Sequence, residues 1–494
     1  MKIAFLTFGC RLNRAEAHDE EARLLAEGHT VVSLDDGPSP DLIVVRGCSV
    51  TAKAERDCRK TIAHLRARHP SSRIQITGCL NPSPSDSSPV TRHPSPVTPT
   101  PLIPLRTARA YLKVQDGCSG RCAFCIVPSF RGKPRSVPFD QVLARARVFL
   151  SAGYRELVVT GCNLALYRES GHGLPDLLAA LATLGKGHRV RLSSLEPGVC
   201  DDGVLAAFAA HPNICRFIHL SVQSGSDAVL ARMNRPYVIE TVDKFCAAAL
   251  RALGPRLALG ADIITGFPGE TESDFAATRD FLVRHPFANL HVFPYSERPG
   301  TPAATMDGSL PPPLRRARAR ELEKLAQAKR LAFAESFLGQ PVEVCIESDN
   351  TGWTAEYLKC SFDLDGCKCP KDLVPLARRS LVQGRVVQAM GDRLIAVPLS
   401  PNKRMVGPRG FEPLTFCTPT ASHVAAVGGA CRRTPCFTGV RGMSKSAVVP
   451  FEAMCPKVCP MTFSGGFRCR FLAPTAPAAG ESFITASAWG SRMR

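Results

Sequence analysis

Three cysteines, Cys118, Cys122 and Cys125, lie within eight residues and are the side chains of this sequence best suited to hold a metal cofactor. Three thiolates can occupy three corners of an iron-sulfur cube, which normally takes four cysteines. The remaining iron would keep an open coordination position, the property that separates catalytic metal sites from closed structural ones. The spacing therefore predicts a four-iron cluster whose open iron binds a substrate.

A zinc site is the alternative for this motif. Zinc sites usually combine two cysteine pairs or add histidines, and no histidine occurs between His93 and His172. The Cys-x3-Cys-x2-Cys spacing instead resembles the signature of the radical S-adenosylmethionine (SAM) superfamily. That resemblance implies that the open iron chelates the amino and carboxylate groups of SAM.

Three further cysteines, Cys10, Cys48 and Cys79, each follow a strand-like segment in the first eighty residues. Strand and helix patterns alternate there, which predicts an α/β fold with a doubly wound, flavodoxin-like parallel sheet. The carboxyl ends of parallel strands meet at one edge, so we expect these thiols to converge on a second cluster. A single such cysteine would be a small buried side chain, as we interpret Cys58. The predicted strands are 2–7, 29–33, 41–45 and 73–77, and the predicted helices are 13–28 and 52–69.

The middle of the chain, residues 110–310, predicts a partial barrel. Six strand-like segments alternate with helical ones, so we expect a (β/α)6 arrangement with its site at the carboxyl ends of the strands. The three-cysteine motif follows the first of these strands, where such a site belongs. Residues 81–109, rich in Pro, Ser and Thr, predict an extended linker before it. The six strands are predicted at 111–114, 156–160, 190–193, 217–222, 262–265 and 290–293.

Three regions follow the barrel. Residues 311–340 predict a long basic linker helix, and residues 341–400 predict a small β-barrel of the OB-like size that commonly binds nucleic acid. Residues 401–494 show no sustained period and predict disorder or read-through sequence. Four arginines in the first turns of the helix are either an RNA contact or a solvated face: Arg315, Arg316, Arg318 and Arg320.

Composition narrows the class of protein. A chain of 494 residues predicts two to four domains. Its 21 cysteines are irregularly spaced and no secretory signal precedes them, which favours reduced thiols in the cytoplasm. No apolar stretch is long enough for a membrane span, so we expect no membrane partner. The net charge of +19 suggests a polyanionic partner, although the residues after Ser400 contribute +9 of it.

The two cysteine sets together resemble the methylthiotransferase family of radical SAM enzymes over residues 1–398. The family usually carries a further strand and helix between the sets, where this chain has its proline-rich segment, so residues 1–80 are expected to form a shortened amino-terminal domain. The amino-terminal motif Thr7–Asn13 and the last barrel motif, His291–Ser296, look most like the transfer-RNA N6-threonylcarbamoyladenosine methylthiotransferases, and the region from Pro341 onward looks like a TRAM domain. The motifs that carry the resemblance are Thr7–Asn13, Arg131–Ser136, Leu192–Pro197, His219–Ser226, Gly266–Glu270, His291–Ser296 and Gly352–Tyr357.

The resemblance implies a reaction, in which an adenosine beside the tRNA anticodon gains a 2-methylthio group. It implies two [4Fe-4S] clusters: one at the Cys118, Cys122 and Cys125 set that cleaves SAM, and one at the Cys10, Cys48 and Cys79 set that carries the sulfur. The implied partners are the tRNA anticodon stem-loop, SAM and an electron donor. The alternatives are a sister enzyme acting on isopentenyladenosine or on a ribosomal-protein aspartate, and a non-enzymatic RNA-binding relic with one cluster lost.

Four strand-end residues are candidates for binding SAM. Gly161 and Asn163 follow the second barrel strand and are placed to contact its amino group, while Glu196 and Gln223 would hold its ribose or methionine part. Each has a structural alternative. Gly161 would only supply an unusual backbone angle, and the polar residues would cap helices.

Overall fold

The computed structural model describes residues 1–34, 39–80, 107–198, 202–364 and 376–399. Contacts divide the chain into two units, Met1–His423 and Val424–Arg494, and the second lies wholly outside the described residues. The predicted linker at 81–109, apart from 107–109, and the predicted tail at 401–494 also lie outside them. Among the helices that are described, none is long and apolar enough to cross a membrane.

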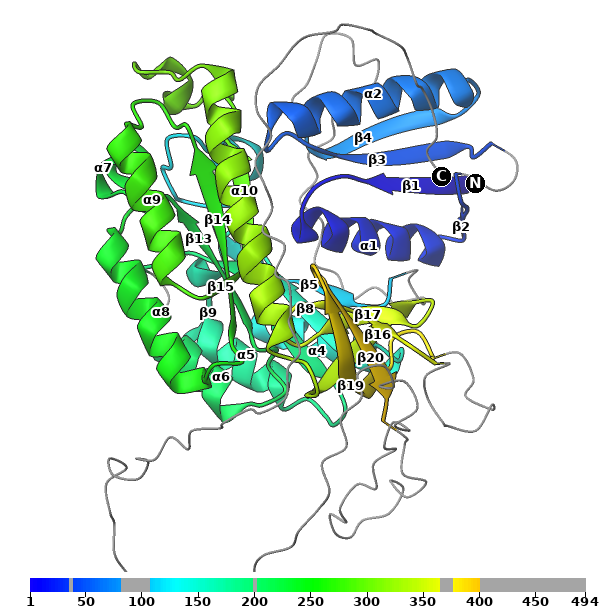
Figure 1. The fold of residues 1–494 in the computed structure, drawn as a ribbon. Helices are drawn as coiled ribbons and strands as arrows, with labels where there is room; N and C mark the ends of the chain where they lie inside the picture. Colours follow the sequence, from blue (N-terminus) through cyan, green and yellow to red (C-terminus); the bar gives the residue numbers. More distant parts are fainter. Residues whose placement is uncertain (35–38, 81–106, 199–201, 365–375, 400–494) are drawn as a thin grey trace, which may run out of the picture. The chain divides into compact units, whose positions relative to one another are not determined.

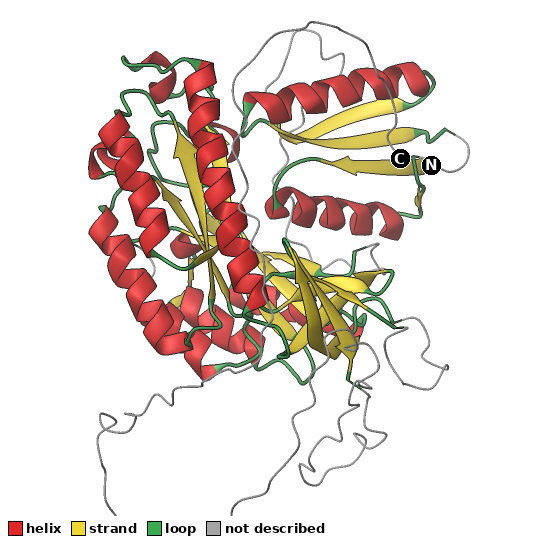
Figure 2. Ribbon diagram, in the orientation of Figure 1, coloured by secondary structure: helices red, strands yellow, loops and turns green. Residues whose placement is uncertain are grey.

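The amino-terminal sheet has four parallel strands in the order β2-β1-β3-β4. Helices α1 (Arg11–Ala26) and α2 (Ala52–Arg68) cover its opposite faces (Figure 2). Strand β3 is buried along its whole length because alternate residues pack towards one helix or the other, as expected for a sheet covered on both sides. The predicted elements are confirmed, and two of the strands run on to Cys48 and Cys79. The strands are β1 (Lys2–Thr7), β2 (Thr30–Val31), β3 (Leu42–Cys48) and β4 (Arg73–Cys79).

The central part has two all-parallel sheets, in the orders β11-β8-β5 and β12-β13-β14-β15 (Figure 1). All six predicted strands are confirmed, and the one predicted at 190–193 is followed directly by a further short strand, because the chain changes sheets there. Ser193 still donates its N–H to the carbonyl of Val159, whereas Ser194 pairs with His219 of the second sheet. The strands are β5 (Ala110–Lys113), β8 (Glu156–Thr160), β11 (Arg189–Leu192), β12 (Ser194–Leu195), β13 (Phe217–Gln223), β14 (Ala258–Thr265) and β15 (Phe287–Pro294).

Helices pack against these sheets and bury the largest hydrophobic core, which alternate strand residues such as Leu259, Ala261 and Ile263 share with them. The longer helices are α4 (Phe139–Ser151), α5 (Leu174–Ala182), α6 (Asp202–Ala210), α8 (Ile239–Leu253) and α9 (Glu272–Arg284). A short antiparallel pair, β6 (Gln115–Asp116) and β7 (Arg135–Ser136), encloses the cysteine motif and helix α3 (Val127–Arg131).

Helix α10 (Pro312–Glu335) packs along β15 and β14 and places Leu322 in the central core. The structure corrects the interpretation of the four arginines in the first turns of this helix. Arg315 and Arg318 are buried, and they form ion pairs with Glu297 (2.6 Å) and Glu270 (2.6 Å) respectively. Residues three apart share one helix face, and this face packs against the central region that carries β14 and β15. Only Arg316 and Arg320 of the four are exposed and free to meet a partner.

The small barrel after α10 is closed, in the order β16-β17-β18-β20-β19, as the alternation after Pro341 predicts. Its interior includes Val344, Ile346 and Cys360. The strands are β16 (Pro341–Ser348), β17 (Thr351–Thr354), β18 (Lys359–Phe362), β19 (Leu381–Met390) and β20 (Arg393–Pro398).

Two buried arginines attach this barrel to the first central sheet. Arg189 donates to the carbonyl of Trp353 (2.6 Å) and Arg191 to that of Thr354 (2.7 Å), while Glu156 pairs with both guanidinium groups. Burial raises the pKa of Glu156, but Arg191 and Arg189 outweigh it and hold that pKa well below its usual range. The small barrel therefore supplies hydrogen-bond acceptors that the central sheet needs.

Candidate metal centres and their surroundings

The first cysteine set is assembled from the ends of three elements. Cys10 is the N-cap of α1, and Cys48 and Cys79 are register partners at the last residues of β3 and β4. The three thiols are close enough for Cys10 and Cys79 to raise the pKa of Cys48. The structure thus brings together the three residues that the strand-end argument selected.

Close backbone packing surrounds this set. Gly9 has a φ of +91°, and a Cβ there would lie 2.8 Å from the Cβ and 2.9 Å from the Sγ of Cys48. Only glycine tolerates both conditions. The side-chain nitrogen of Asn13 donates to the carbonyls of Phe8 and Gly47, each at 2.9 Å. Asn13 therefore ties the turn that carries Cys10 to the strand that carries Cys48.

The second set lies in one loop between β6 and α3. The N–H of Gly120 donates to Cys118 Sγ (3.2 Å), and a Cβ on Gly120 would lie 3.2 Å from Cys118 Sγ and 3.8 Å from Cys122 Sγ. The N–H of Cys125 donates to the carbonyl of Cys122 (3.0 Å). Arg235, from the segment after α7 (Asp227–Arg232), donates to Cys122 Sγ at 3.0 Å. The loop therefore folds so that the three sulfur atoms gather on one side.

Burial and neighbouring thiols raise the pKa of Cys48 and that of Cys125, each to about 11. Burial also raises the pKa of Cys79 and of Cys122, where Arg131 and Arg235 respectively oppose it. Without a metal these thiols are therefore neutral, and a coordinating metal would deprotonate them. Two converging sets of three thiols suit iron-sulfur clusters that each have one iron free of protein ligands.

The same sulfur atoms fit a single zinc ion less well. A tetrahedral zinc with Zn–S bonds of about 2.3 Å needs sulfur atoms roughly 3.8 Å apart. Within the described residues, the one group of three or more His, Cys, Asp or Glu whose ligand atoms all lie within 4.8 Å is His219, Asp262 and His291. Neither cysteine set is that compact, so the larger iron-sulfur cube fits them better.

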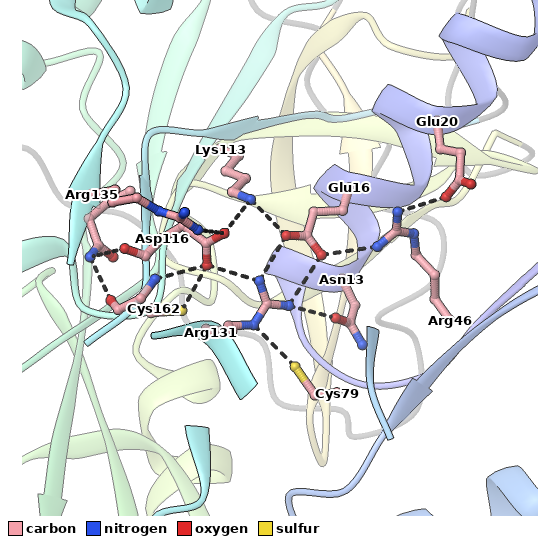
Figure 3. Close-up of polar contacts among 12 residues, drawn as sticks. Asn13, Glu16, Glu20, Arg46, Cys79, Lys113, Asp116, Arg131, Arg135 and Cys162 are labelled. Atoms are coloured by element: carbon pink, nitrogen blue, oxygen red, sulfur yellow. Dashed lines mark hydrogen bonds and ion pairs between the residues drawn. The ribbon is translucent and has the colours of Figure 1, made fainter. Parts of the chain in front are cut away.

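A buried charged network surrounds Arg131 and reaches the first set at Cys79 (Figure 3). Arg131, the last residue of α3, donates to Cys79 Sγ (3.1 Å), Glu16 (2.8 Å) and Asp116 (3.0 Å). Lys113 bridges the same two carboxylates at 2.7 Å each. Burial raises the pKa of Asp116, but Lys113 and Arg131 outweigh it and lower that pKa to about 2. Arg131 thus follows one cysteine set in sequence and contacts the other in space.

The candidate SAM-binding residues lie beside the second set. Asn163 donates to Glu196, which forms an ion pair with Arg235 (3.1 Å), and Arg235 reaches Cys122. Asn163 also caps the short helix η1 (Leu164–Leu166) by accepting from the N–H of Ala165, so its capping alternative is confirmed as one of its contacts.

The two remaining candidates are placed as follows. Gln223 ends β13 with a φ of +70° and is buried. Gly161 does not need a positive φ, so the backbone-angle alternative is wrong. A Cβ there would lie 2.9 Å from the Cβ and Oε1 of Gln115, and close packing is the reason for glycine.

Sequence reasoning did not assign the two arginines that donate to cysteine sulfur. Arg131 begins the segment Arg131–Ser136, one of the motifs that carry the family resemblance, but the sequence alone gives this segment no role. Arg235 is 110 residues beyond Cys125, and no spacing connects them. A buried cation is noticed only when its partner is known, and here the fold supplies the partner.

Comparison with known proteins identifies two regions. Residues 112–282 match the radical SAM superfamily, and residues 2–90 match a family described as uncharacterized protein family UPF0004. The protein named threonylcarbamoyladenosine tRNA methylthiotransferase MtaB is 30% identical in Aquifex aeolicus, over 72% of this chain and 96% of the relative. Its counterpart in Thermotoga maritima is 33% identical, over 69% and 85%. The tRNA-2-methylthio-N(6)-dimethylallyladenosine synthase of Sphingopyxis alaskensis is 31% identical, also over 69% and 85%.

Proposed function

The chain belongs to the radical SAM methylthiotransferase family, and from this premise we propose that it converts N6-threonylcarbamoyladenosine beside a tRNA anticodon to its 2-methylthio derivative. Two kinds of relative match at similar identity, so membership alone does not choose the substrate. Five relatives that are 30–33% identical to this chain bear the threonylcarbamoyladenosine name. The motif Thr7–Asn13 and the strand motif His291–Ser296 favour the same choice.

Membership of the family implies a [4Fe-4S] cluster and SAM. We assign this cluster to Cys118, Cys122 and Cys125, and a second cluster to Cys10, Cys48 and Cys79. When bound, the first supplies an electron for SAM cleavage and the second carries sulfur. The chain's own residues position these groups. Arg235 and Arg131 each give one charge-assisted hydrogen bond to a ligand sulfur, which favours the more negative state of a cluster.

The observation that carries the proposal is that Arg131 follows one cysteine set in sequence and contacts the other in space. It lies on the helix after Cys125 and donates to Cys79 Sγ at 3.1 Å, while Asp116 and Glu16 hold it from either side. Sulfur insertion needs the substrate carbon to meet the radical and the sulfur in one place. The contact supports such an arrangement, because it fixes the helix that follows one set against a ligand of the other.

The SAM-binding roles follow from the same geometry. Asn163 and Glu196 are connected through Arg235 to Cys122, and Gln223 ends the neighbouring strand β13. We propose that Asn163 and Gly161 meet the amino group of SAM, and that Glu196 and Gln223 meet its ribose or methionine part.

We propose that the small closed barrel is TRAM-like and that it binds the tRNA backbone together with Arg316 and Arg320. Both arginines are exposed, which phosphate contacts require. Arg315 and Arg318 are excluded from that role, because they are buried in ion pairs with Glu297 and Glu270. The tRNA substrate would place the enzyme in the cytoplasm, where an unidentified electron donor would reduce it.

We also propose that the domains follow the sequence-based divisions: a flavodoxin-like domain at 1–80, a radical SAM (β/α)6 domain at 110–310, the helix at 311–340 and the TRAM-like barrel at 341–400. Deleting the last of these is a poor test of RNA binding, because Arg189 and Arg191 would lose buried acceptors. Substituting Arg316 and Arg320 together is cleaner. We expect it to weaken tRNA binding and its salt dependence without changing SAM cleavage.

The deciding experiment is nucleoside analysis of tRNA after reaction with the reconstituted enzyme. Separate tRNA substrates would carry threonylcarbamoyladenosine or isopentenyladenosine, and the Cys122→Ala variant would be the inactive control. We expect a 2-methylthio product only from the first tRNA, and about eight iron atoms per chain. A product only from the second tRNA, or only from a ribosomal protein, would assign the sister activity. About four iron atoms without product would favour the RNA-binding relic.

A further inference from the structure

Three polar side chains that the proposed function does not use lie on neighbouring strands. His219 is on β13, Asp262 on β14 and His291 on β15, three strands that lie side by side in the second central sheet (Figure 1). Asp262 and His291 are register partners, and His219 pairs with Gly260. The residues before and after each of them belong to the helix-covered core, so the trio lies on the other face of the sheet.

The imidazole of His219 is buried and incompletely satisfied. The residue is only 3% exposed, and neither ring nitrogen has a hydrogen-bond partner. Nε2 lies 2.9 Å from Asp262 Oδ1, a suitable distance, yet no hydrogen bond with acceptable direction is formed. Nδ1 faces Gly260, where an added Cβ would lie 2.4 Å from it. A buried polar group without a hydrogen-bond partner is destabilising, and a metal ion bound at Nε2 would provide that partner.

The positions of the ligand atoms suit a metal ion. Asp262 Oδ1 lies 2.9 Å from His219 Nε2 and 3.1 Å from His291 Nδ1, and all three ligand atoms lie within 4.8 Å of one another. Metal–ligand bonds of about 2.1 Å place adjacent ligand atoms roughly 3.0–3.4 Å apart, from octahedral to tetrahedral geometry. The trio could therefore close on an ion with only small side-chain movements.

We propose that His219, Asp262 and His291 bind a divalent transition-metal ion, zinc or iron(II), and leave at least one coordination position open. Two imidazoles and one carboxylate are the ligands of open zinc sites and of non-haem iron(II) sites. No cysteine belongs to the group, so this site is chemically distinct from both thiol sets. It also does not depend on which tRNA base the enzyme modifies.

A further polar side chain lies beside the trio. Asn289 lies 3.5 Å from the outer nitrogen of His291 and is held by Arg330 at 2.9 Å. The first of these contacts is too long to fix which nitrogen of His291 carries the proton.

The alternative is a purely structural Asp–His cluster, and zinc titration separates the two. The holoenzyme is reconstituted with iron and sulfide first, so that the six cluster thiols are occupied, and Zn²⁺ binding is then measured by calorimetry. The variants are Asp262→Asn and His291→Gln. His291 is half exposed, so its replacement should not prevent folding. The matched control is His64→Gln, an exposed histidine on α2.

We expect the wild type and His64→Gln to bind one equivalent of Zn²⁺, and both trio variants to bind it at least about 100-fold more weakly. X-ray absorption spectroscopy at the zinc edge should show only nitrogen and oxygen ligands around the zinc ion. Equal affinity in all four proteins, or sulfur in the zinc shell, would overturn the proposal. Thermal unfolding and iron content of each variant show that the comparison is made between folded, cluster-loaded proteins.

Discussion

Cys118, Cys122 and Cys125 occupy one loop, whereas Cys10, Cys48 and Cys79 are brought together from a segment of 70 residues. The loop set depends on local turns, such as the N–H of Gly120 on Cys118 Sγ. The other set depends on the register of β3 with β4, because a one-residue slip would separate Cys48 from Cys79. A local set is recognisable from spacing, while a distributed set exists only if the sheet forms correctly.

The two sets also differ in how their arginines are held. Arg235 donates to Cys122 and forms an ion pair with Glu196, which is itself partly exposed. Arg131 donates to Cys79 and is paired with both Glu16 and Asp116. Damage near the loop set should therefore stay local. Damage at Arg131 should reach Cys79 and also Asp116, which lies two residues before Cys118.

The largest expected effects come from the ligands themselves. Cys122→Ala should abolish reductive SAM cleavage, with a loss of at least about 1000-fold, because two thiolates do not hold a four-iron cluster. Cys48→Ala should leave SAM cleavage measurable and abolish methylthio formation. Both should lower iron from about eight to about four atoms per chain. The measurements are 5'-deoxyadenosine release, nucleoside analysis and iron content.

Cys58→Ala is the matched control for the ligand variants. Cys58 is buried in the amino-terminal domain, as Cys48 is, but it lies in the middle of α2 and belongs to neither cysteine set. It should keep both activities and all the iron. Normal SAM cleavage by Cys122→Ala would refute the assignment of the radical site. Loss of SAM cleavage in all three variants Cys10→Ala, Cys48→Ala and Cys79→Ala would show that the distributed set is needed for folding.

Arg131→Met tests the link between the centres. It leaves Glu16 and Asp116 with one cation fewer in a buried setting, and breaking such a pair costs about 3–5 kcal/mol. Arg235→Met should cost less, because Arg235 forms an ion pair with one carboxylate, that of Glu196, whereas Arg131 pairs with two. Chemical denaturation of the apoproteins measures both losses. In the reconstituted enzymes, each substitution should lower the reduction potential of its own cluster, since a hydrogen bond to sulfur is removed.

The potentials, measured by redox titration with electron paramagnetic resonance, also distinguish a positioning role from a structural one. Arg131→Lys and Arg235→Lys keep the charge and should recover part of the stability. If Arg131→Met changed neither the stability nor either potential, the two centres would not be coupled through this residue.

Glu156→Gln should destabilise the chain without touching either thiol set. Glu156 is fully buried and pairs with Arg109, Arg189 and Arg191. Its loss therefore leaves three buried cations with one fewer anion, at a cost of about 3 kcal/mol. Iron content should stay unchanged. Glu343→Gln is the control, because Glu343 is partly exposed and 3.5 Å from Arg189, and its change should be within about 0.5 kcal/mol. Equal stability of the two variants would contradict the role given to Glu156.

The pH dependence of the free energy of unfolding tests the contact that His18 makes between the amino-terminal domain and the first central sheet. Its ring packs edge-on against Tyr111 of β5, and burial, with Arg14 and Arg145, lowers its pKa from 6.5 to about 4. The folded chain therefore binds this proton less readily than the unfolded chain. The free energy of unfolding keeps its full value above about pH 6.5 and falls towards pH 4, by up to about 3 kcal/mol.

Urea denaturation at pH 7, 6 and 5 measures this loss. His18→Leu should flatten the pH dependence over that range, because the titrating group is gone. An unchanged slope in His18→Leu would show that other groups cause it.

The smallest expected effect is that of ending the chain after Ser400. The six cysteines beyond that residue belong to neither set, and no spacing among them completes a metal site. The shortened enzyme should keep its iron, its SAM cleavage and its methylthio product within about two-fold. A cooperative unfolding transition of isolated residues 401–494, or a loss of iron in the shortened chain, would contradict this.

Local patterns in the sequence determined much of the site. The eight-residue spacing of Cys118, Cys122 and Cys125 was sufficient to predict one centre, because all its ligands lie in a single loop. The strand ends at Cys10, Cys48 and Cys79 predicted the second, since parallel strands share an edge. The six strands predicted for the central part and the small closed barrel also followed from periodicity.

Only the tertiary structure decided where the charges go. Arg315 and Arg318 resemble solvated or RNA-binding residues in sequence, yet they are buried in ion pairs. The contacts of Arg131 and Arg235 with cysteine sulfur, and the switch of sheets at Ser193, were likewise invisible. The partner of a buried ion, and the sheet that a strand joins, depend on segments far away in the chain. Local periodicity carries no information about them.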